Sequence, residues 1–251
     1  MKRDDDLIFR FREQFTCPYL NDKRTASIEY LLIPEVGSAD LDEYLSRGYR
    51  RLDTVLYHNC CKGCSSCMPI RLEAADFRPS RSQRRTLCEN EDLHVIILQA
   101  PQVTSQKVRL YEKYLRVKHG SEAGGKDSGP REALLQLHCG WRHALEMDYY
   151  LGQKLVGVGI VDEGRNSLSS NYFYYDTDFL SRRLGIFSVM QEIFLAQRLR
   201  KRYYYLGFYV AETAKMAYKK DFMPNQILRN GNWADFLNGK SDAASGRAKA
   251  R

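Results

Sequence analysis

Long apolar runs are absent from this sequence of 251 residues, in which no stretch of about 18 consecutive apolar residues occurs. A membrane-spanning helix needs about 20 such residues, so the sequence predicts no segment of that kind. Residues 1–12 alternate charged residues with single hydrophobic ones and lack the continuous apolar core of a signal peptide. We therefore expect a cytoplasmic protein that does not bind a membrane.

The order and spacing of the histidine, serine, cysteine and aspartate residues also indicate no catalytic triad. The five histidines show no spacing from serine, cysteine or aspartate residues that indicates one, so we do not predict covalent catalysis. Disorder is excluded for most of the chain, because 43% of the residues are hydrophobic and 12% are aromatic. This composition is sufficient for the core of one large domain or two small ones.

Acidic residues are in the minority, with 31 Asp and Glu against 39 Lys and Arg, which gives a net charge of +8. The segment 238–251 contributes +3 of this charge and consists mainly of small and basic residues. It lacks core-forming side chains, so we expect a mobile basic tail. The excess that remains in the folded part favours an anionic partner.

The seven cysteines are not spread in pairs as in a secreted disulfide scaffold, since four of them stand within residues 60–67. Cys61, Cys64 and Cys67 have the two-residue spacing of metal ligands, and Cys17 or Cys60 would complete a set of four thiolates. Such a set suits zinc or an iron–sulfur cluster. Reduced buried thiols and redox sensing are the alternatives. The chemistry considered below requires no cofactor.

The segment 121–130 is the expected linker, because it holds three glycines and a proline but no large hydrophobic residue. We therefore divide the chain into an N-terminal domain with the cysteine-rich loop (1–120), a C-terminal domain (121–237) and the tail (238–251). Periodicity predicts helices at 39–47, 103–117 and 132–139 and from residue 184 onward, strands at 26–33, 94–99, 167–175 and 203–210, and a hairpin over 147–162.

The order of hairpin, aromatic strand, basic turn, glycine-opened helix and further aromatic strand resembles the core of GNAT-type acyltransferases. In that core a helix N-terminus binds phosphate through free amide groups. Here Arg182 and Gly185 stand at the matching turn. Phe187 stands where coenzyme A needs a small residue for its pyrophosphate, which favours another donor. We expect an α+β fold of two GNAT-like halves with mixed sheets flanked by helices.

Several short motifs together resemble one family over residues 15–228, although each motif alone is weak. The family is the arginyltransferase superfamily of aminoacyl-tRNA–protein transferases, in its bacterial aspartate/glutamate leucyltransferase branch. The motifs are Cys17-Pro-Tyr-Leu20, the run from Tyr57 to Arg71, Arg81-Ser-Gln-Arg-Arg85 with Asn90, Ser169-Ser-Asn-Tyr172, Leu184-Gly185, Tyr205-Leu-Gly-Phe-Tyr209, Lys215-Met-Ala-Tyr-Lys219 and Phe222-Met-Pro224.

The resemblance implies transfer of leucine from leucyl-tRNA to proteins that begin with Asp or Glu, which marks them for degradation by the N-degron pathway. The donor is an activated ester, so positioning and oxyanion stabilisation matter more than a nucleophile. Tyr172, Asp176 and Tyr209 are the candidate catalytic groups near the aminoacyl end. Tyr205 and Tyr218 are candidates for stacking on the terminal adenine. The alternative is that most of these aromatic side chains belong to the core.

An acidic acceptor requires a cation in its pocket, and the candidates are Arg71, Arg81, Arg84 and Lys219, with Arg71 preferred. Candidate tRNA contacts are Arg85, Arg182 and Gly185, and the basic run 81–85 is also consistent with a solvated surface.

Two other donors remain open. The first is arginyl-tRNA with the same acceptors, and the second is acetyl-CoA, as in a GNAT-type N-acetyltransferase. An RNA-binding module without catalysis accounts for the charge but not for the helix opening at Leu184 and Gly185.

Overall fold

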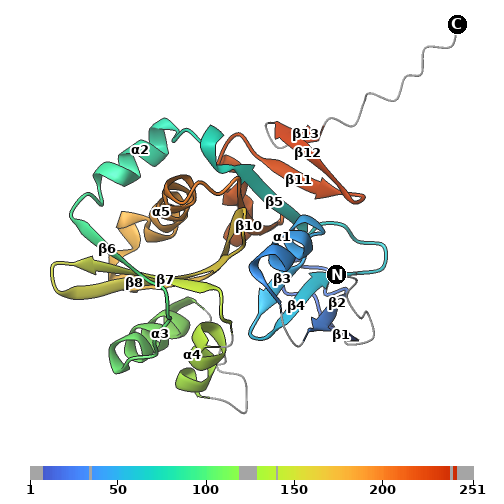
Figure 1. The fold of residues 1–251 in the computed structure, drawn as a ribbon, viewed down its shortest axis with the longest axis horizontal. Helices are drawn as coiled ribbons and strands as arrows, with labels where there is room; N and C mark the ends of the chain where they lie inside the picture. Colours follow the sequence, from blue (N-terminus) through green and yellow to red (C-terminus); the bar gives the residue numbers. More distant parts are fainter. Residues whose placement is uncertain (1–7, 34–35, 119–128, 140, 238–239, 242–251) are drawn as a thin grey trace, which may run out of the picture.

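The computed structural model describes residues 8–33, 36–118, 129–139, 141–237 and 240–241 (Figure 1). It contains two β-sheets with helices packed against them, and the larger sheet is mixed. The predicted α+β class with mixed sheets flanked by helices is therefore confirmed. Within the described ranges, no helix combines the length and the apolar character that crossing a membrane requires.

The smaller sheet is antiparallel and has the strand order β1-β2-β4-β3. Its strands are β1 (Phe9–Thr16), β2 (Thr25–Leu32), β3 (Arg50–Leu52) and β4 (Val55–Asn59). Helix α1 (Ser38–Ser46) buries Leu41 and Leu45 against Leu31 and Leu56 of this sheet. The predicted strand at 26–33 and helix at 39–47 are confirmed.

The larger sheet has nine strands in the order β13-β12-β11-β5-β10-β9-β8-β7-β6. Only β9 and β10 run parallel, and the helix α5 connects them. The strands are β5 (Met68–Glu73), β6 (Leu93–Leu98), β7 (Ala144–Leu151), β8 (Lys154–Glu163), β9 (Ser167–Tyr175), β10 (Tyr203–Tyr209), β11 (Gln226–Arg229), β12 (Asn232–Leu237) and β13 (Lys240–Ser241). This confirms the strands predicted at 94–99, 167–175 and 203–210 and the hairpin over 147–162.

The division near residue 120 remains a prediction, and the sheet topology bears on it. Strands β5 and β6 precede that point in the chain, yet they pair with β10 and β7, which follow it. The linker expected at 121–130 falls mostly outside the described residues, as does the tail at 238–251. Lys240 and Ser241 are the described part of the tail, and they pair with β12.

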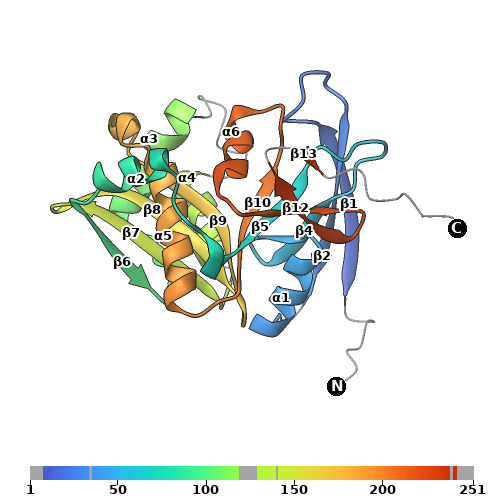
Figure 2. The same ribbon diagram turned by 90° about the horizontal axis from the view of Figure 1, so that it is seen from above.

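Helices cover both faces of the large sheet (Figures 1 and 2). α3 (Ser105–Lys118) and α4 (Pro130–Cys139) pack on one face, where Leu110 and Leu134 meet Val158 and Tyr174. α5 (Leu184–Arg198) packs on the other face with Met190 and Ile193 in the main core. Strand β8 is consequently buried on both sides, which explains its almost continuous apolar sequence.

The basic segment at 81–85 forms a helix that periodicity does not predict. α2 (Arg81–Cys88) begins at a capping box, in which Ser80 Oγ accepts from the amide of Gln83 at 3.3 Å and Gln83 Oε1 accepts from the amide of Ser80 at 2.8 Å. The short helical elements are η2 (Ala74–Asp76), η3 (Thr177–Arg182), α6 (Ala214–Ala217) and η4 (Tyr218–Asp221).

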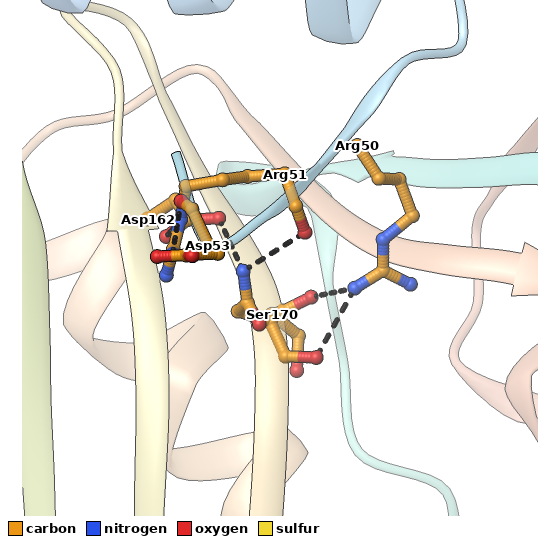
Figure 3. A network of polar contacts seen from close by, with 6 residues as sticks. Arg50, Arg51, Asp53, Asp162 and Ser170 are labelled. Atoms are coloured by element: carbon orange, nitrogen blue, oxygen red, sulfur yellow. Dashed lines mark hydrogen bonds and ion pairs between the residues drawn. The ribbon is translucent and has the colours of Figure 1, made fainter. Parts of the chain in front are cut away.

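The two sheets meet at β3, where a buried ion pair joins them (Figure 3). Arg51 Nε donates to Asp162 Oδ1 of β8 at 2.7 Å, and these side chains are 0% and 2% exposed. Asn171 of β9 donates to the other oxygen of Asp162 at 2.9 Å and to the carbonyl of Arg51 at 3.3 Å. Strands β8 and β9 of the large sheet therefore both contact strand β3 of the small sheet through these side chains.

We predict that Asp162→Asn lowers the free energy of unfolding by about 3–5 kcal/mol, because it leaves the guanidinium of Arg51 buried without a counter-charge. Urea unfolding measures the change. The matched control is Asp92→Asn, since Asp92 pairs with Arg182 while 49% of its side chain is exposed. That variant should lose at most about 1 kcal/mol. Equal losses in the two variants would contradict the prediction.

Candidate functional site

A cavity of about 540 Å³ lies at the N-terminal end of α5. Strand β9, the N-terminal part of α5, α6 and η4 form most of its wall, and it is completed by one side chain from β3, one from β10 and two from α3. Among the described residues, five basic side chains and one acidic side chain line it, namely Arg50, Lys118, Arg183, Lys215, Lys219 and Glu192. This excess of positive charge suits an anionic ligand.

The start of α5 gives the cavity an anion-binding wall. A helix of this length carries free amide groups and the positive end of its dipole in its first turn. A Cβ built on Gly185 meets no atom within 4 Å, so this position faces open space. Arg183 precedes the helix in the left-handed conformation, with φ 54°, and its guanidinium donates to Ser82 Oγ of α2 at 2.8 Å.

Phe187 does not obstruct this wall, contrary to the expectation from the sequence. Its side chain is 4% exposed and packs on Tyr149 with the ring centroids 6.0 Å apart. It therefore belongs to the main core and lies outside the cavity lining. Phe187 therefore gives no reason to exclude coenzyme A as the donor, because the helix turns this side chain toward the sheet.

Glu192 is the acid of the cavity and is 0% exposed. Its two oxygens accept hydrogen bonds from the Tyr204 hydroxyl at 2.7 Å and from Ser188 Oγ at 3.0 Å. The hydroxyl of Tyr149 in turn donates to Ser188 Oγ at 3.2 Å. Burial raises the pKa of Glu192 to about 7, and these hydrogen bonds oppose the shift. The carboxyl group of Glu192 is therefore protonated more readily than that of a solvent-exposed glutamate.

Two of the predicted tyrosines line the cavity. Burial is the main cause that raises the pKa of Tyr172 far above its usual value, so its phenol acts as a hydrogen-bond donor. Its ring meets those of Tyr111 and Tyr114 edge-on. Burial also raises the pKa of Tyr218 to about 12. The other predicted residues in the lining are Gly185 and Lys219.

The remaining predicted catalytic residues lie outside this cavity. Asp176 pairs with Lys113 and, at 2.7 Å, with Lys154, and it caps η3 through the amide of Asp178. Burial alone raises the pKa of Asp176, but the hydrogen bonds from both lysines outweigh it and lower the pKa. Tyr209 is buried against Phe236 at a centroid distance of 5.1 Å.

Arg71 and Tyr205 form a separate buried cluster. Arg71 donates to the Tyr205 hydroxyl at 3.2 Å and to Gln226 Oε1 at 3.0 Å. Its guanidinium lies between the rings of Tyr203 and Trp233, 3.9 Å and 4.1 Å from their centroids. The guanidinium of Arg71 is thus engaged by side chains of the fold itself, and Arg71 does not line the cavity at α5.

The predicted cations of α2 are on the surface. Arg81, Arg84 and Arg85 are exposed, and Arg84 donates to the carbonyl of Pro79 at 2.6 Å. Arg182 makes two hydrogen bonds to Asp92, at 2.6 and 2.9 Å. These residues flank the start of α5 without entering its cavity.

The cysteines at 17, 61, 64 and 67 line one small cavity of about 170 Å³. Hydrogen bonds from Ser66 lower the pKa of the Cys64 thiol, whereas burial raises the pKa of Cys67 to about 12. No three His, Cys, Asp or Glu side chains of the described chain are placed to hold a metal ion. The zinc or iron–sulfur site at these cysteines stays a prediction.

Sequence reasoning missed Arg50 and Glu192. Glu192 stands four residues after Ser188 within the apolar stretch of α5, and a lone acid on a core-facing helix is a signal that identifies it. Arg50 has no such signal, because only the packing of β3 against β9 brings it to the cavity.

The raised pKa of Glu192 predicts a pH effect on stability. The folded protein binds this proton more tightly than the unfolded chain, so its contribution is present below about pH 4.5 and is lost as the pH rises to about 7. Relative to Glu192→Gln, the wild type should lose about 3 kcal/mol of unfolding free energy across this interval. Urea unfolding at a series of pH values measures the difference, and parallel profiles would contradict it.

Comparison with known proteins agrees with these features. Residues 15–85 and 106–229 match the family models described as the N terminus and the C terminus of arginine-tRNA–protein transferase. An aspartate/glutamate leucyltransferase of Pseudoalteromonas atlantica is 31% identical over 90% of this chain and 96% of its own length. The enzyme of that name from Shewanella putrefaciens is 35% identical over 87% and 92%. The crystal structure of FemX overlaps with a TM-score of 0.45 at 6% identity, covering 83% of this chain and 81% of that one. On the relatives and the two family matches, the chain belongs to the arginine-tRNA–protein transferase family that includes the bacterial aspartate/glutamate leucyltransferases.

Proposed function

We propose that this protein transfers leucine from leucyl-tRNA to the α-amino group of proteins that begin with Asp or Glu. The observation that carries the proposal is the identity of 31% and 35% to aspartate/glutamate leucyltransferases over almost the full length of both chains. The positively charged cavity at α5 supports it, since both substrates bring negative charge to the site.

The reaction needs little from the protein beyond placement and charge. The amine of the acceptor attacks the ester carbonyl of the donor, a peptide bond forms, and the 3′-hydroxyl of tRNA leaves with a proton. A free α-amine has a pKa near 8, so it needs only a weak base. Glu192 has a pKa suited to accept this proton, and Tyr172 is a hydrogen-bond donor for the developing oxyanion.

The N-terminal wall of α5 is the proposed site for the phosphate that joins the terminal adenosine of tRNA to the preceding nucleotide. Gly185 leaves the first-turn amides accessible, and Arg183 adds a fixed cation beside them. Exposed arginines of α2 extend the positive surface toward the acceptor stem. This placement implies that tRNA approaches from the α2 side, and charged tRNA as a substrate implies a cytoplasmic location.

The donor and the acceptor are tested in one assay. Purified protein is offered a peptide beginning with Asp together with leucyl-tRNA, arginyl-tRNA or acetyl-CoA, and the modified peptide is measured by mass spectrometry. We expect addition of leucine only. Addition of arginine would identify arginyl-tRNA as the donor in place of leucyl-tRNA. Acetylation would indicate an N-acetyltransferase. No product with any of the three donors would refute the proposal.

The phosphate contact at Gly185 is tested by a pair of variants of equal size. Gly185→Glu places a carboxylate in the open space, whereas Gly185→Gln fills it without charge. Acidic residues suit a helix N-terminus, so neither variant should unfold the protein. We expect Gly185→Glu to raise the KM for leucyl-tRNA at least about tenfold above that of Gly185→Gln. Equal KM values for the two variants would place the phosphate elsewhere.

A further inference from the structure

Two cations of the cavity lack a counter-charge within the described part of the chain. Lys219 is only 8% exposed, yet no carboxylate lies within 4.0 Å of its ammonium group there. Arg50 likewise forms no ion pair with a described residue, and its buried Nε has no hydrogen-bond partner. Burial disfavours the charged form of a basic group that has no counter-charge, so a bound anion is the expected compensation.

Arg50 is held in one position by its surroundings. Its Nη2 donates to the backbone carbonyl groups of Ser170 and Asn171 on β9 (Figure 3). Its guanidinium also lies over the ring of Phe208, 5.8 Å from the centroid. Gly207 makes this path available, because a Cβ at that position would lie 1.5 Å from Arg50 Nη1. The cation is therefore preorganised rather than mobile.

Glu192 completes the charge pattern of this part of the cavity. Arg50, Lys219 and Glu192 line the same cavity, where burial and then the positive charge of Arg50 lower the pKa of Lys219 well below its usual value, whereas Glu192 raises it. An N-terminal Asp or Glu residue presents an α-amino group and a carboxylate a few bonds apart. One carboxylate and two cations on the wall match that pair of charges.

On the basis of the proposed function, we propose that Arg50 and Lys219 form the subsite for the side-chain carboxylate of the acceptor's first residue. Glu192 lines the same cavity and is then the acidic group available to the adjacent α-amino group, which is the attacking nucleophile. Arg50 and Lys219 are thus specificity-determining residues, and they distinguish Asp from Asn by charge.

A tRNA phosphate is the competing anion for these cations. The buried position of Lys219 and the presence of Glu192 favour a small carboxylate that carries its own ammonium group. The start of α5 and the exposed Arg183 offer a more open phosphate site.

The test uses two peptides that are identical except for a first residue of Asp or Asn, with binding measured by calorimetry in the absence of tRNA. Wild-type protein should bind the Asp peptide at least about tenfold more tightly. Lys219→Met should abolish this preference without lowering the melting temperature, because it replaces a buried basic group that has no described counter-charge by an apolar side chain of similar length. Arg50→Lys, which retains the charge but loses the planar fork, should reduce the preference.

Lys220→Met is the matched control, since Lys220 is the next residue, is exposed and lies outside the cavity lining. It should retain the wild-type preference. Equal binding of the two peptides by wild-type protein, or a preference that survives in Lys219→Met, would overturn the subsite. A higher KM for leucyl-tRNA in Lys219→Met with an unchanged peptide preference would assign the cations to phosphate. Charge-selective peptide binding without leucine transfer would support the subsite and refute the proposed function.

Discussion

The buried ion pair between Arg51 and Asp162 is the contact on which the geometry of the site depends. It ties the short strand β3 of the small sheet to β8 of the large one, and Asn171 of β9 reinforces it. Consecutive side chains of a strand point in opposite directions, so fixing Arg51 in the core directs its neighbour Arg50 toward β9 and the cavity. One structural pair thereby positions one functional cation.

This dependence gives the two parts of the chain different roles. The part after residue 106 supplies α5, η4 and most of the cavity lining, including Glu192 and Lys219. The part before it supplies Arg50 across the junction of the sheets. Because the cavity lining includes side chains from both parts, it is complete only when the small sheet is packed against the large one.

The helices and strands of the second half could be predicted because their sequences carry a clear period. The stripe along α5 and the turn between β7 and β8 identify those elements directly. The period of apolar residues does not predict helix α2, because arginines fill much of its sequence and its start depends on the capping box at Ser80. The position of Phe187 in a motif likewise does not show which face of the helix its side chain occupies, and the structure turns it toward the core.

The site itself was only partly predictable. Tyr172, Gly185, Tyr218 and Lys219 were named from motifs and do line one cavity, whereas Arg71, Asp176, Tyr205 and Tyr209 are engaged with neighbours elsewhere. Residue type and order alone determined the family, the α+β class and the excess of positive charge, because these are properties of the chain. Only the tertiary structure decided which of the many arginines and lysines lack a counter-charge among the described residues, because ion pairing depends on contacts between β3, β9, α5 and η4, which are far apart in the sequence.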